Sequence, residues 1–329
     1  MKILLVSTRR NLNPGDQFIR LGVQNLVTSV CPEAEFERIN KEDHADVTRE
    51  RPFDKVILCG MPLWWDNPVN YSADIHWWEP LMRGWLSERK KDFLILGAGS
   101  VVGKHPFNAS RFGAAVDECV ERAFAVVTRN KVIDHPHLID SICPAAFSTF
   151  GPGITPSGGR HLKACNLMPS GAHDAHLNEH EAKWWREKVL PSLAQKLLSR
   201  GFLFCAHDQV EYDMARSLGW SDPRLFDTPE ENLAFYRQAK IYVGNRLHAG
   251  VVVAASGGSA SVVGYDSRTE MVKPFTSAVF HPSDFSSEKA IDDLADGCSM
   301  AASSSTSADF GLLEHHRQLQ RDIIRKFLL

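Results

Sequence analysis

The chain has 329 residues, of which 43% are hydrophobic and 23% are charged, and its formal net charge at pH 7 is −3. This length suits two domains of ordinary size, and this composition excludes a disordered or fibrous chain. The basic residues form no stripe, which disfavours a nucleic-acid partner.

In the first half, short apolar runs alternate with helical patterns, which is typical of parallel sheets built from α/β units. Apolar side chains at helical spacing predict helices at residues 16–30 and 111–122. We expect strands at Ile3–Val6, Val56–Cys59, Phe93–Leu96 and Ala125–Thr128.

Two glycine-bearing segments follow strands of this half, where open α/β sheets bind ligands. Asn13, Gly15 and Asp16 precede the first helix, whose N-terminus favours an anion, although a tight turn capped by Asp16 fits the spacing better. Gly99 and Ser100 belong to a Gly-Ala-Gly-Ser turn that only weakly matches a phosphate-binding loop.

Arg129 and a tryptophan-rich stretch are further candidates in this half. The planar guanidinium of Arg129 suits a carboxylate or phosphate, and an arginine lying over a surface helix is an equal alternative. Trp65 and Trp77 offer flat faces to a sugar acceptor, but tryptophans also pack lids and dimer contacts.

Glycine and proline are dense at Gly151–Gly159, which predicts a boundary between domains 1–155 and 156–329. The second half repeats the α/β alternation and ends in a helix at 312–328. Asp208 with Glu211 predicts a capping box, and Thr228-Pro229 begins another helix. We expect strands at Leu162–Leu167, Phe202–Cys205, Ile241–Val243 and Ser261–Val263.

The most informative segment is Asn245–Ala249, which leaves the Ile241–Val243 strand and opens a helix of small residues. His248 at a helix N-terminus favours its neutral form and can exchange protons near neutral pH. A lone histidine is more often structural, but the neighbouring Arg246 and the strand-end position favour a functional role.

Arg246-Leu247-His248-Ala249, followed by Val262–Asp266, resembles the C-terminal signature of polysaccharide pyruvyl transferases. The Asn13–Asp16 segment, the Gly97–Ser100 turn and Val127-Thr128-Arg129 fit in the same order, so the resemblance spans roughly residues 1 to 275. It implies two Rossmann-like domains facing across a cleft, similar to GT-B glycosyltransferases.

The resemblance also implies transfer of the pyruvyl group of phosphoenolpyruvate to a sugar, with release of phosphate. It assigns donor binding and catalysis to Arg129 and His248, with Arg246 and Arg268 adding positive charge. Arg268 stands where many members carry lysine, and Cys143 stands in a stretch where an aspartate is expected. In GT-B-like folds the terminal helix can return to the first domain.

Two other functions remain open. A GT-B-like glycosyltransferase would use a nucleotide sugar, and a catalytically silent relative would bind glycans or anions without chemistry. Fold alone does not separate these functions.

We expect no cofactor and no metal. His176 and His180 are one helical turn apart and could bind zinc together with His173, but no H-E-x-x-H motif or nearby cysteine accompanies them.

The seven cysteines form no C-x-x-C pair, which predicts reduced thiols and a cytoplasmic location. No apolar stretch approaches the roughly 20 residues of a membrane-spanning helix. Peripheral membrane contact and the oligomeric state stay open.

Overall fold

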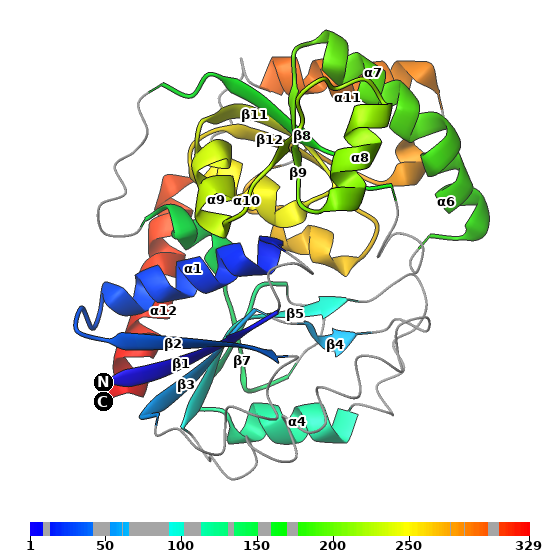
Figure 1. Cartoon of the computed structure of the whole chain (residues 1–329). Coiled ribbons are helices and arrows are strands. Elements are labelled where there is room, and N and C mark those ends of the chain that lie inside the picture. The colour runs from blue at the N-terminus through cyan, green and yellow to red at the C-terminus, as the bar shows by residue number, and fades with distance from the viewer. Residues whose placement is uncertain are drawn as a thin grey trace. The chain divides into compact units, whose positions relative to one another are not determined.

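The computed structural model describes residues 1–8, 14–41, 53–60, 62–65, 92–101, 113–130, 135–150, 159–169, 177–276, 278–285, 287–301 and 309–329. The chain divides into two compact units, which we call unit 1 (Met1–Gly153 with Leu313–Leu329) and unit 2 (Ile154–Leu312). Each unit is built around a parallel sheet, so the predicted α/β class with two Rossmann-like domains is confirmed (Figure 1).

The sheet of unit 1 has the order β2-β1-β3-β5-β6-β7, with β4 pairing β5. All its strand pairs are parallel. The first strand lies between the edge strand β2 and β3, and it is apolar and fully buried from Ile3 to Val6. The strands are β1 (Lys2–Ser7), β2 (Glu35–Asn40), β3 (Lys55–Cys59), β4 (Pro62–Trp65), β5 (Phe93–Val101), β6 (Val126–Thr128) and β7 (Leu138–Asp140).

Helices α1 (Pro14–Thr28) and α4 (Gly113–Arg122) cover opposite faces of this sheet (Figure 1). The buried face of α4 packs on alternate strand residues such as Leu4 and Val56. On the other face, α1 packs against the 3₁₀ helix η3 (Pro144–Thr149), and Gly22 allows the two backbones to approach closely.

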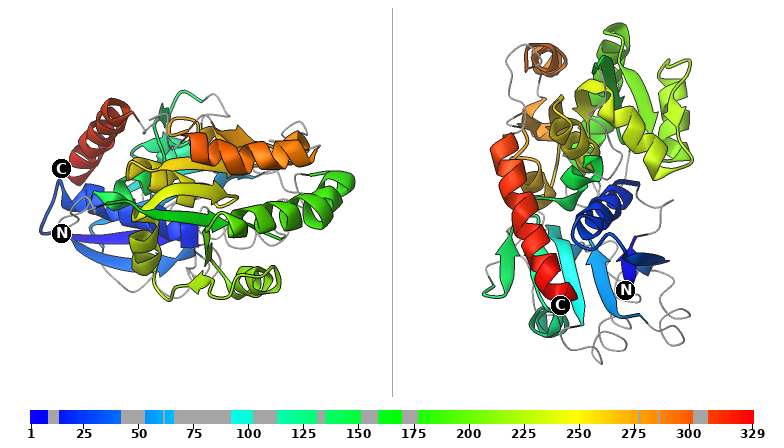
Figure 2. Two further views of the ribbon diagram at one scale, coloured as in Figure 1. Left: turned by 90° about the horizontal axis from the view of Figure 1, so that it is seen from above. Right: turned by 90° about the vertical axis from the view of Figure 1, so that its left-hand side faces the viewer.

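The last helix, α12 (Phe310–Leu328), packs on unit 1, and both chain termini lie at the same end of that unit (Figure 2). Its buried apolar side chains include Ile324 and Phe327, and the buried amide of Gln320 donates to Ser141 Oγ and to the carbonyl of Ile142. The sequence analysis listed this helix with domain 156–329 and allowed for its return to the first domain. Its apolar face packs on unit 1.

The sheet of unit 2 has the order β10-β9-β8-β11-β12-β13, again with parallel pairs. Its central strands are apolar and buried on both faces, as expected for strands covered by helices on two sides. The strands are β8 (Leu162–Asn166), β9 (Leu203–Ala206), β10 (Arg224–Leu225), β11 (Ala239–Gly244), β12 (Ser259–Val263) and β13 (Val279–Phe280).

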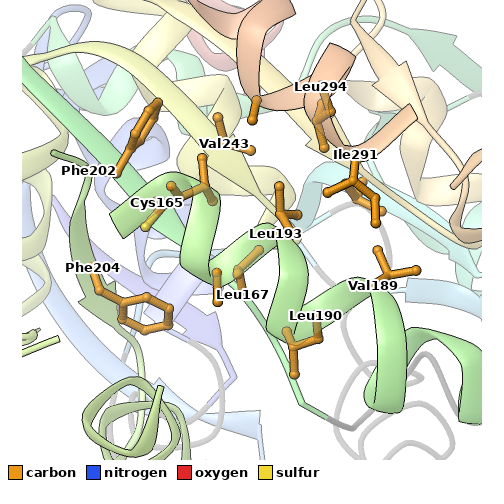
Figure 3. Close-up of a cluster of buried hydrophobic side chains, with 14 of the residues drawn as sticks. Cys165, Leu167, Val189, Leu190, Leu193, Phe202, Phe204, Val243, Ile291 and Leu294 are labelled. Atoms are coloured by element: carbon orange, nitrogen blue, oxygen red, sulfur yellow. The ribbon is translucent and has the colours of Figure 1, made fainter. Parts of the chain in front are cut away.

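One face of this sheet carries the main hydrophobic core of unit 2 (Figure 3). There Cys165 and Val243 of the sheet meet Leu193 of α7 and Leu294 of α11, and the opposite face carries α9 and α10. The helical elements are α6 (Glu179–Trp184), the π-helix η4 (Trp185–Val189), α7 (Leu190–Ser199), α8 (Gln209–Ser217), α9 (Pro229–Arg237), α10 (Leu247–Ala255), the 3₁₀ helices η5 (Ser267–Met271) and η6 (Pro282–Asp284), and α11 (Glu288–Ala301).

Local signals in the sequence locate several helix ends correctly. The capping box of Thr228 and Glu231 begins α9, with Pro229 at its first position. Gly219, with a φ of 107°, follows the end of α8, where only glycine adopts the left-handed backbone easily. Among the described helices, none has the length and apolar character needed to cross a membrane.

Candidate active site

In unit 1, the start of α1 lies next to the carboxyl end of β1. Asp16 is 7% exposed and lies inside the first turn of the helix, because α1 begins at Pro14, so it is not the cap that the sequence suggested. Gly15 is buried beside it, while Asn13 lies outside the described residues.

The Gly97–Ser100 segment is part of strand β5 and not the turn that the sequence predicted. Gly97 takes a φ of 78°, after which the strand continues because β4 and β6 supply further pairing, including Gly99 with Pro62 and Ala98 with Thr128. A phosphate-cradling loop is therefore wrong for this segment.

Gly99 makes room for the guanidinium of Arg129 at the end of β6. A Cβ atom at Gly99 would lie 2.8 Å from Arg129 Nε and 2.9 Å from Nη2. Arg129 is only 4% exposed, so the surface-arginine alternative is wrong. Thus the structure brings together two residues that the sequence analysis selected separately.

Ser100 and Asn130 fix this sheet edge by reciprocal hydrogen bonds. The backbone N–H of Ser100 donates to Asn130 Oδ1 at 3.0 Å, and Asn130 Nδ2 donates to the Ser100 carbonyl at 2.9 Å. Asn130 was not selected from the sequence, although it directly follows Arg129. The pair holds the Arg129 backbone beside Gly99.

Cys143 lies beside the Arg129 side chain. Burial raises the pKa of the Cys143 thiol, while the positive charge and a hydrogen bond of Arg129 oppose that shift. A neutral thiol therefore accompanies Arg129, in a stretch where the resemblance implies an aspartate.

Arg20 is a further buried cation of unit 1 that the sequence analysis missed. Arg20 is 4% exposed, its Nε donates to Gln17 Oε1 at 2.8 Å, and Gln17 Nε2 donates to the Thr8 carbonyl at 2.6 Å. The signal was available, because Asp16, Gln17 and Arg20 put polar groups at helical spacing on a buried stretch of α1.

In unit 2, Asn245 ties together the carboxyl ends of three neighbouring strands. Its Oδ1 accepts from the Met168 N–H after β8, and its Nδ2 donates to the Val263 carbonyl of β12, both at 3.1 Å. Gly244 is needed just before it, because a Cβ atom there would lie 2.1 Å from the Asn166 carbonyl oxygen. This packing fixes the start of α10.

Arg246 is held by two carboxylates. Its Nε donates to Glu211 Oε1 at 2.8 Å, its Nη2 donates to the same oxygen at 2.5 Å, and Nη2 also contacts Asp208 Oδ2 at 3.2 Å. Burial alone would lower the pKa of the Arg246 guanidinium, but Glu211 and Asp208 together raise it. Arg246 is therefore a permanent, oriented cation.

Glu211 does not complete the predicted capping box. Asp208 caps α8 by accepting from the Glu211 N–H at 2.8 Å, but the Glu211 carboxylate accepts from the His207 N–H and from Arg246 and not from the Asp208 N–H. A charge-assisted hydrogen bond with an arginine is stronger than a hydrogen bond to one backbone N–H.

His248 occupies the second position of α10 and is 8% exposed. His207 directly follows β9. Burial, Arg246 and His248 lower the pKa of His207 well below its usual value, so His207 is neutral at pH 7. Its Nε2 lies 2.8 Å from Tyr236 Oη.

Arg268 at η5 is held by Asp266 of the same turn. Its Nε lies 2.9 Å and 3.0 Å from the two carboxylate oxygens, its Nη2 lies 2.5 Å from Oδ2, and it is 5.9 Å from the centre of the Tyr265 ring. Asp266 therefore balances much of the charge that the sequence analysis assigned to Arg268.

A sequence model of polysaccharide pyruvyl transferases matches residues 13–267 of the chain. The chain belongs to the polysaccharide pyruvyl transferase family. The predicted family and the prediction of a transferase are thereby confirmed. The matched segment contains the strand-end residues of both units, including Arg129 and His248.

Solved structures show the fold of this pyruvyl transferase family member. A structure described as a UDP-N-acetylglucosamine 2-epimerase from Listeria monocytogenes is 10% identical, with a TM-score of 0.51 over 94% of this chain and 91% of that chain. The E. coli heptosyltransferase WaaC with ADP is 12% identical, with a TM-score of 0.43 over 90% and 99%. No curated protein in the comparison matches the chain. The likeness to the epimerase structure confirms the predicted GT-B-like fold, and it concerns the fold alone.

The aromatic and histidine candidates of the chain are only partly described. Trp65 lies in β4, whereas Trp77, His173 and His176 lie outside the described residues. His180 is exposed in the first turn of α6. In the part of the chain that the structure describes, no three His, Cys, Asp or Glu residues are grouped to hold a metal ion.

Proposed function

We propose that this protein transfers the pyruvyl group of phosphoenolpyruvate to a sugar of a glycan or glycan precursor and releases phosphate. The observation that carries the proposal is the oriented Arg246 beside His248 at the start of α10, inside the segment that matches the pyruvyl transferase family. The family supports a sugar acceptor in polysaccharide biosynthesis.

The donor has a carboxylate and a phosphate, and both need cationic partners. Arg129 of unit 1 is buried, and Arg246 of unit 2 has a side chain that is 14% exposed. Both follow strands at the carboxyl edges of their sheets. A guanidinium is suited to hydrogen-bond two oxygens of such a group. We therefore assign anion binding to these arginines, with a smaller role for Arg268 because Asp266 balances its charge.

Proton transfer is the second requirement of the reaction. Formation of a ketal adds two sugar oxygens to the central carbon of the donor, converts its methylene to a methyl by adding a proton, and expels phosphate. The hydroxyls lose protons in return. An imidazole can exchange protons near neutral pH, and His248 is the residue to which we assign this role.

Acceptor binding belongs to the tryptophan-rich stretch in this proposal. Trp65 and Trp77 would stack on sugar rings, and the alternatives are a lid on the core or a contact between copies of the chain. We place the reaction in the cytoplasm, where buried free thiols such as Cys59 and Cys205 stay reduced.

Acceptor-dependent phosphate release tests the function. Purified protein is incubated with phosphoenolpyruvate and a panel of glycans and glycan precursors, while phosphate is assayed and the new ketal methyl is sought by NMR. We expect both signals together with one class of acceptor. Transfer from a nucleotide sugar without use of phosphoenolpyruvate would favour a glycosyltransferase, and glycan binding without any turnover would favour the silent relative.

A further inference from the structure

Glu211 of α8 is 1% exposed, and each of its carboxylate oxygens has separate partners. Oε1 accepts both hydrogen bonds from Arg246. Oε2 accepts from the His207 N–H at 2.8 Å and from Asn166 Nδ2 at 2.7 Å. One oxygen thus faces the arginine and the other is fixed to the ends of β8 and β9.

Asn166 joins this arrangement to the sheet itself. Its Nδ2 also donates to the Cys205 carbonyl of β9 at 2.7 Å, and its own carbonyl accepts from the Asn245 N–H at 3.1 Å. The ends of β8, β9 and β11 therefore fix the position of the Glu211 carboxylate. A buried carboxylate with four donors in fixed directions orients its partner strongly.

The same contacts leave one edge of the arginine available. Within the described part of the chain, the ion pairs and hydrogen bonds of the Arg246 guanidinium use Nε and Nη2. The side chain is 14% exposed. A guanidinium fixed along one edge presents its remaining nitrogen, Nη1, in a constant direction.

We propose that Glu211 is a positioning residue for Arg246, and that Asn166 and the His207 backbone hold Glu211 in place. The kinetic consequence rests on the proposed function, in which Arg246 binds the donor anion. Preorganised contacts to a reacting group lose much of their effect when displaced by about an ångström.

The net charge around Arg246, considered without its orientation, predicts the opposite effect of Glu211 on donor binding. Glu211 and Asp208 together place two carboxylates on one guanidinium, which weakens the attraction of this cluster for an anion. If Arg246 acted only through its charge, removing either carboxylate would strengthen donor binding. If its orientation matters, removing Glu211 weakens donor binding, whereas Asp208 matters little because its side chain is 38% exposed.

Glu211→Gln is the sharpest substitution. A glutamine keeps the shape of the side chain but replaces one acceptor oxygen by an NH2 group. That NH2 group would face N–H donors, either those of Arg246 or those of Asn166 and His207, so hydrogen bonds on one side would be lost. Asp208→Asn is the matched control, because asparagine still caps α8 and only the charge beside Nη2 is lost.

In the kinetic arm, Glu211→Gln should raise the KM for phosphoenolpyruvate by roughly 10- to 100-fold, and Asp208→Asn should change it less than about 3-fold. The variant Arg246→Gln and the double variant Arg246→Gln with Glu211→Gln should have the same KM, because Glu211 acts only through Arg246. A double variant that is clearly worse than Arg246→Gln would overturn the proposal. The double variant also removes both buried charges, so it supplies this result even if Glu211→Gln folds poorly.

A second arm needs no donor and separates this inference from the proposed function. The Nε–H signal of Arg246, assigned by NMR through its loss in Arg246→Gln, should exchange slowly with water in the wild type and in Asp208→Asn. Exchange should become at least about 10-fold faster in Glu211→Gln, because the hydrogen bond of that N–H is lost. Equal exchange in all three proteins would refute the positioning role. Slow exchange in a protein that does not use phosphoenolpyruvate would refute the proposed function alone.

Discussion

In the proposed function two residues have different roles, so their substitutions should impair the reaction in different ways. His248 lies in the first turn of α10, and Arg129 ends β6 with its guanidinium against Gly99. We expect His248→Ala to lower kcat by roughly 10²- to 10⁴-fold with phosphoenolpyruvate binding retained. Arg129→Ala should lose donor affinity as well as rate. Donor titration and melting temperature of both variants make the comparison, and a well-folded His248→Ala protein with nearly full activity would refute the assignment.

His207 and His316 should make stability depend on pH. Burial is the largest cause that lowers the pKa of each ring, so the folded protein keeps them neutral where the unfolded chain protonates them. Their contribution is complete above the unfolded pKa of about 6.5 and is lost as pH falls below it. The urea concentration at the unfolding midpoint should thus fall as the pH is lowered from about 7.5 to about 5.5. His207→Gln should flatten this dependence, and an unchanged slope in that variant would contradict the role of His207.

At the scale of single residues, the sequence could not reveal side-chain contacts between residues that are far apart in the chain. Arg129, Arg246 and His248 could be selected because each follows an apolar strand pattern. The partners Asn166 and Glu211 are 45 residues apart in the chain, and Glu211 and Arg246 are 35 apart. Local spacing carries no trace of such contacts, so Glu211 was interpreted from its neighbour Asp208 alone.

At the scale of elements, apolar runs located the central strands because a strand buried on both faces must be apolar throughout. Strand β2 was missed because Glu35–Asn40 is largely polar and lies at a sheet edge. The extension of β5 through Gly97–Val101 was missed because glycine normally signals a turn, whereas here β4 and β6 hold the strand together.

Packing of α1 on η3 depends on Gly22. A Cβ atom there would lie 1.8 Å from the Pro144 carbonyl oxygen, and backbone atoms on both sides leave little freedom to adjust. Gly22→Ala should lower the free energy of unfolding by about 1–3 kcal/mol despite the better helix propensity of alanine. Gly311→Ala in α12 is the control, because its nearest neighbour is the Asp309 side chain at 3.1 Å. Chemical denaturation measures both, and equal stability of the two variants would contradict the close approach.

At the scale of the whole molecule, the last helix of the chain completes the first unit. Phe327 is 1% exposed. Its ring centre lies 5.4 Å from the ring centre of Phe124 and 5.0 Å from Lys55 Nζ. A helical pattern in sequence shows which side chains are buried but not which unit receives them. The sequence analysis therefore listed the helix with its neighbours in the chain and left its return to the first domain open.

Phe327→Ala should therefore destabilise unit 1 by about 3–5 kcal/mol, the usual effect of removing a buried aromatic ring. Phe310, at the exposed start of the same helix, is the control, and Phe310→Ala should change stability by less than about 0.5 kcal/mol. Proteolysis should attack unit 1 first in the Phe327 variant. Equal stability of both variants would show that the helix does not contribute to this unit.

Selective stabilisation by the donor is the most direct measurement of the proposed activity. Melting temperatures are compared without ligand, with phosphoenolpyruvate, and with UDP-, GDP- and CMP-sugars, for the wild type and for Arg129→Ala. A ligand that binds only the folded protein stabilises it by about 2.7 kcal/mol at 100 times its Kd. We predict that phosphoenolpyruvate raises the melting temperature of the wild type but not of Arg129→Ala, and that the nucleotide sugars have no effect. Stabilisation by a nucleotide sugar, with none by phosphoenolpyruvate, would contradict a pyruvyl donor.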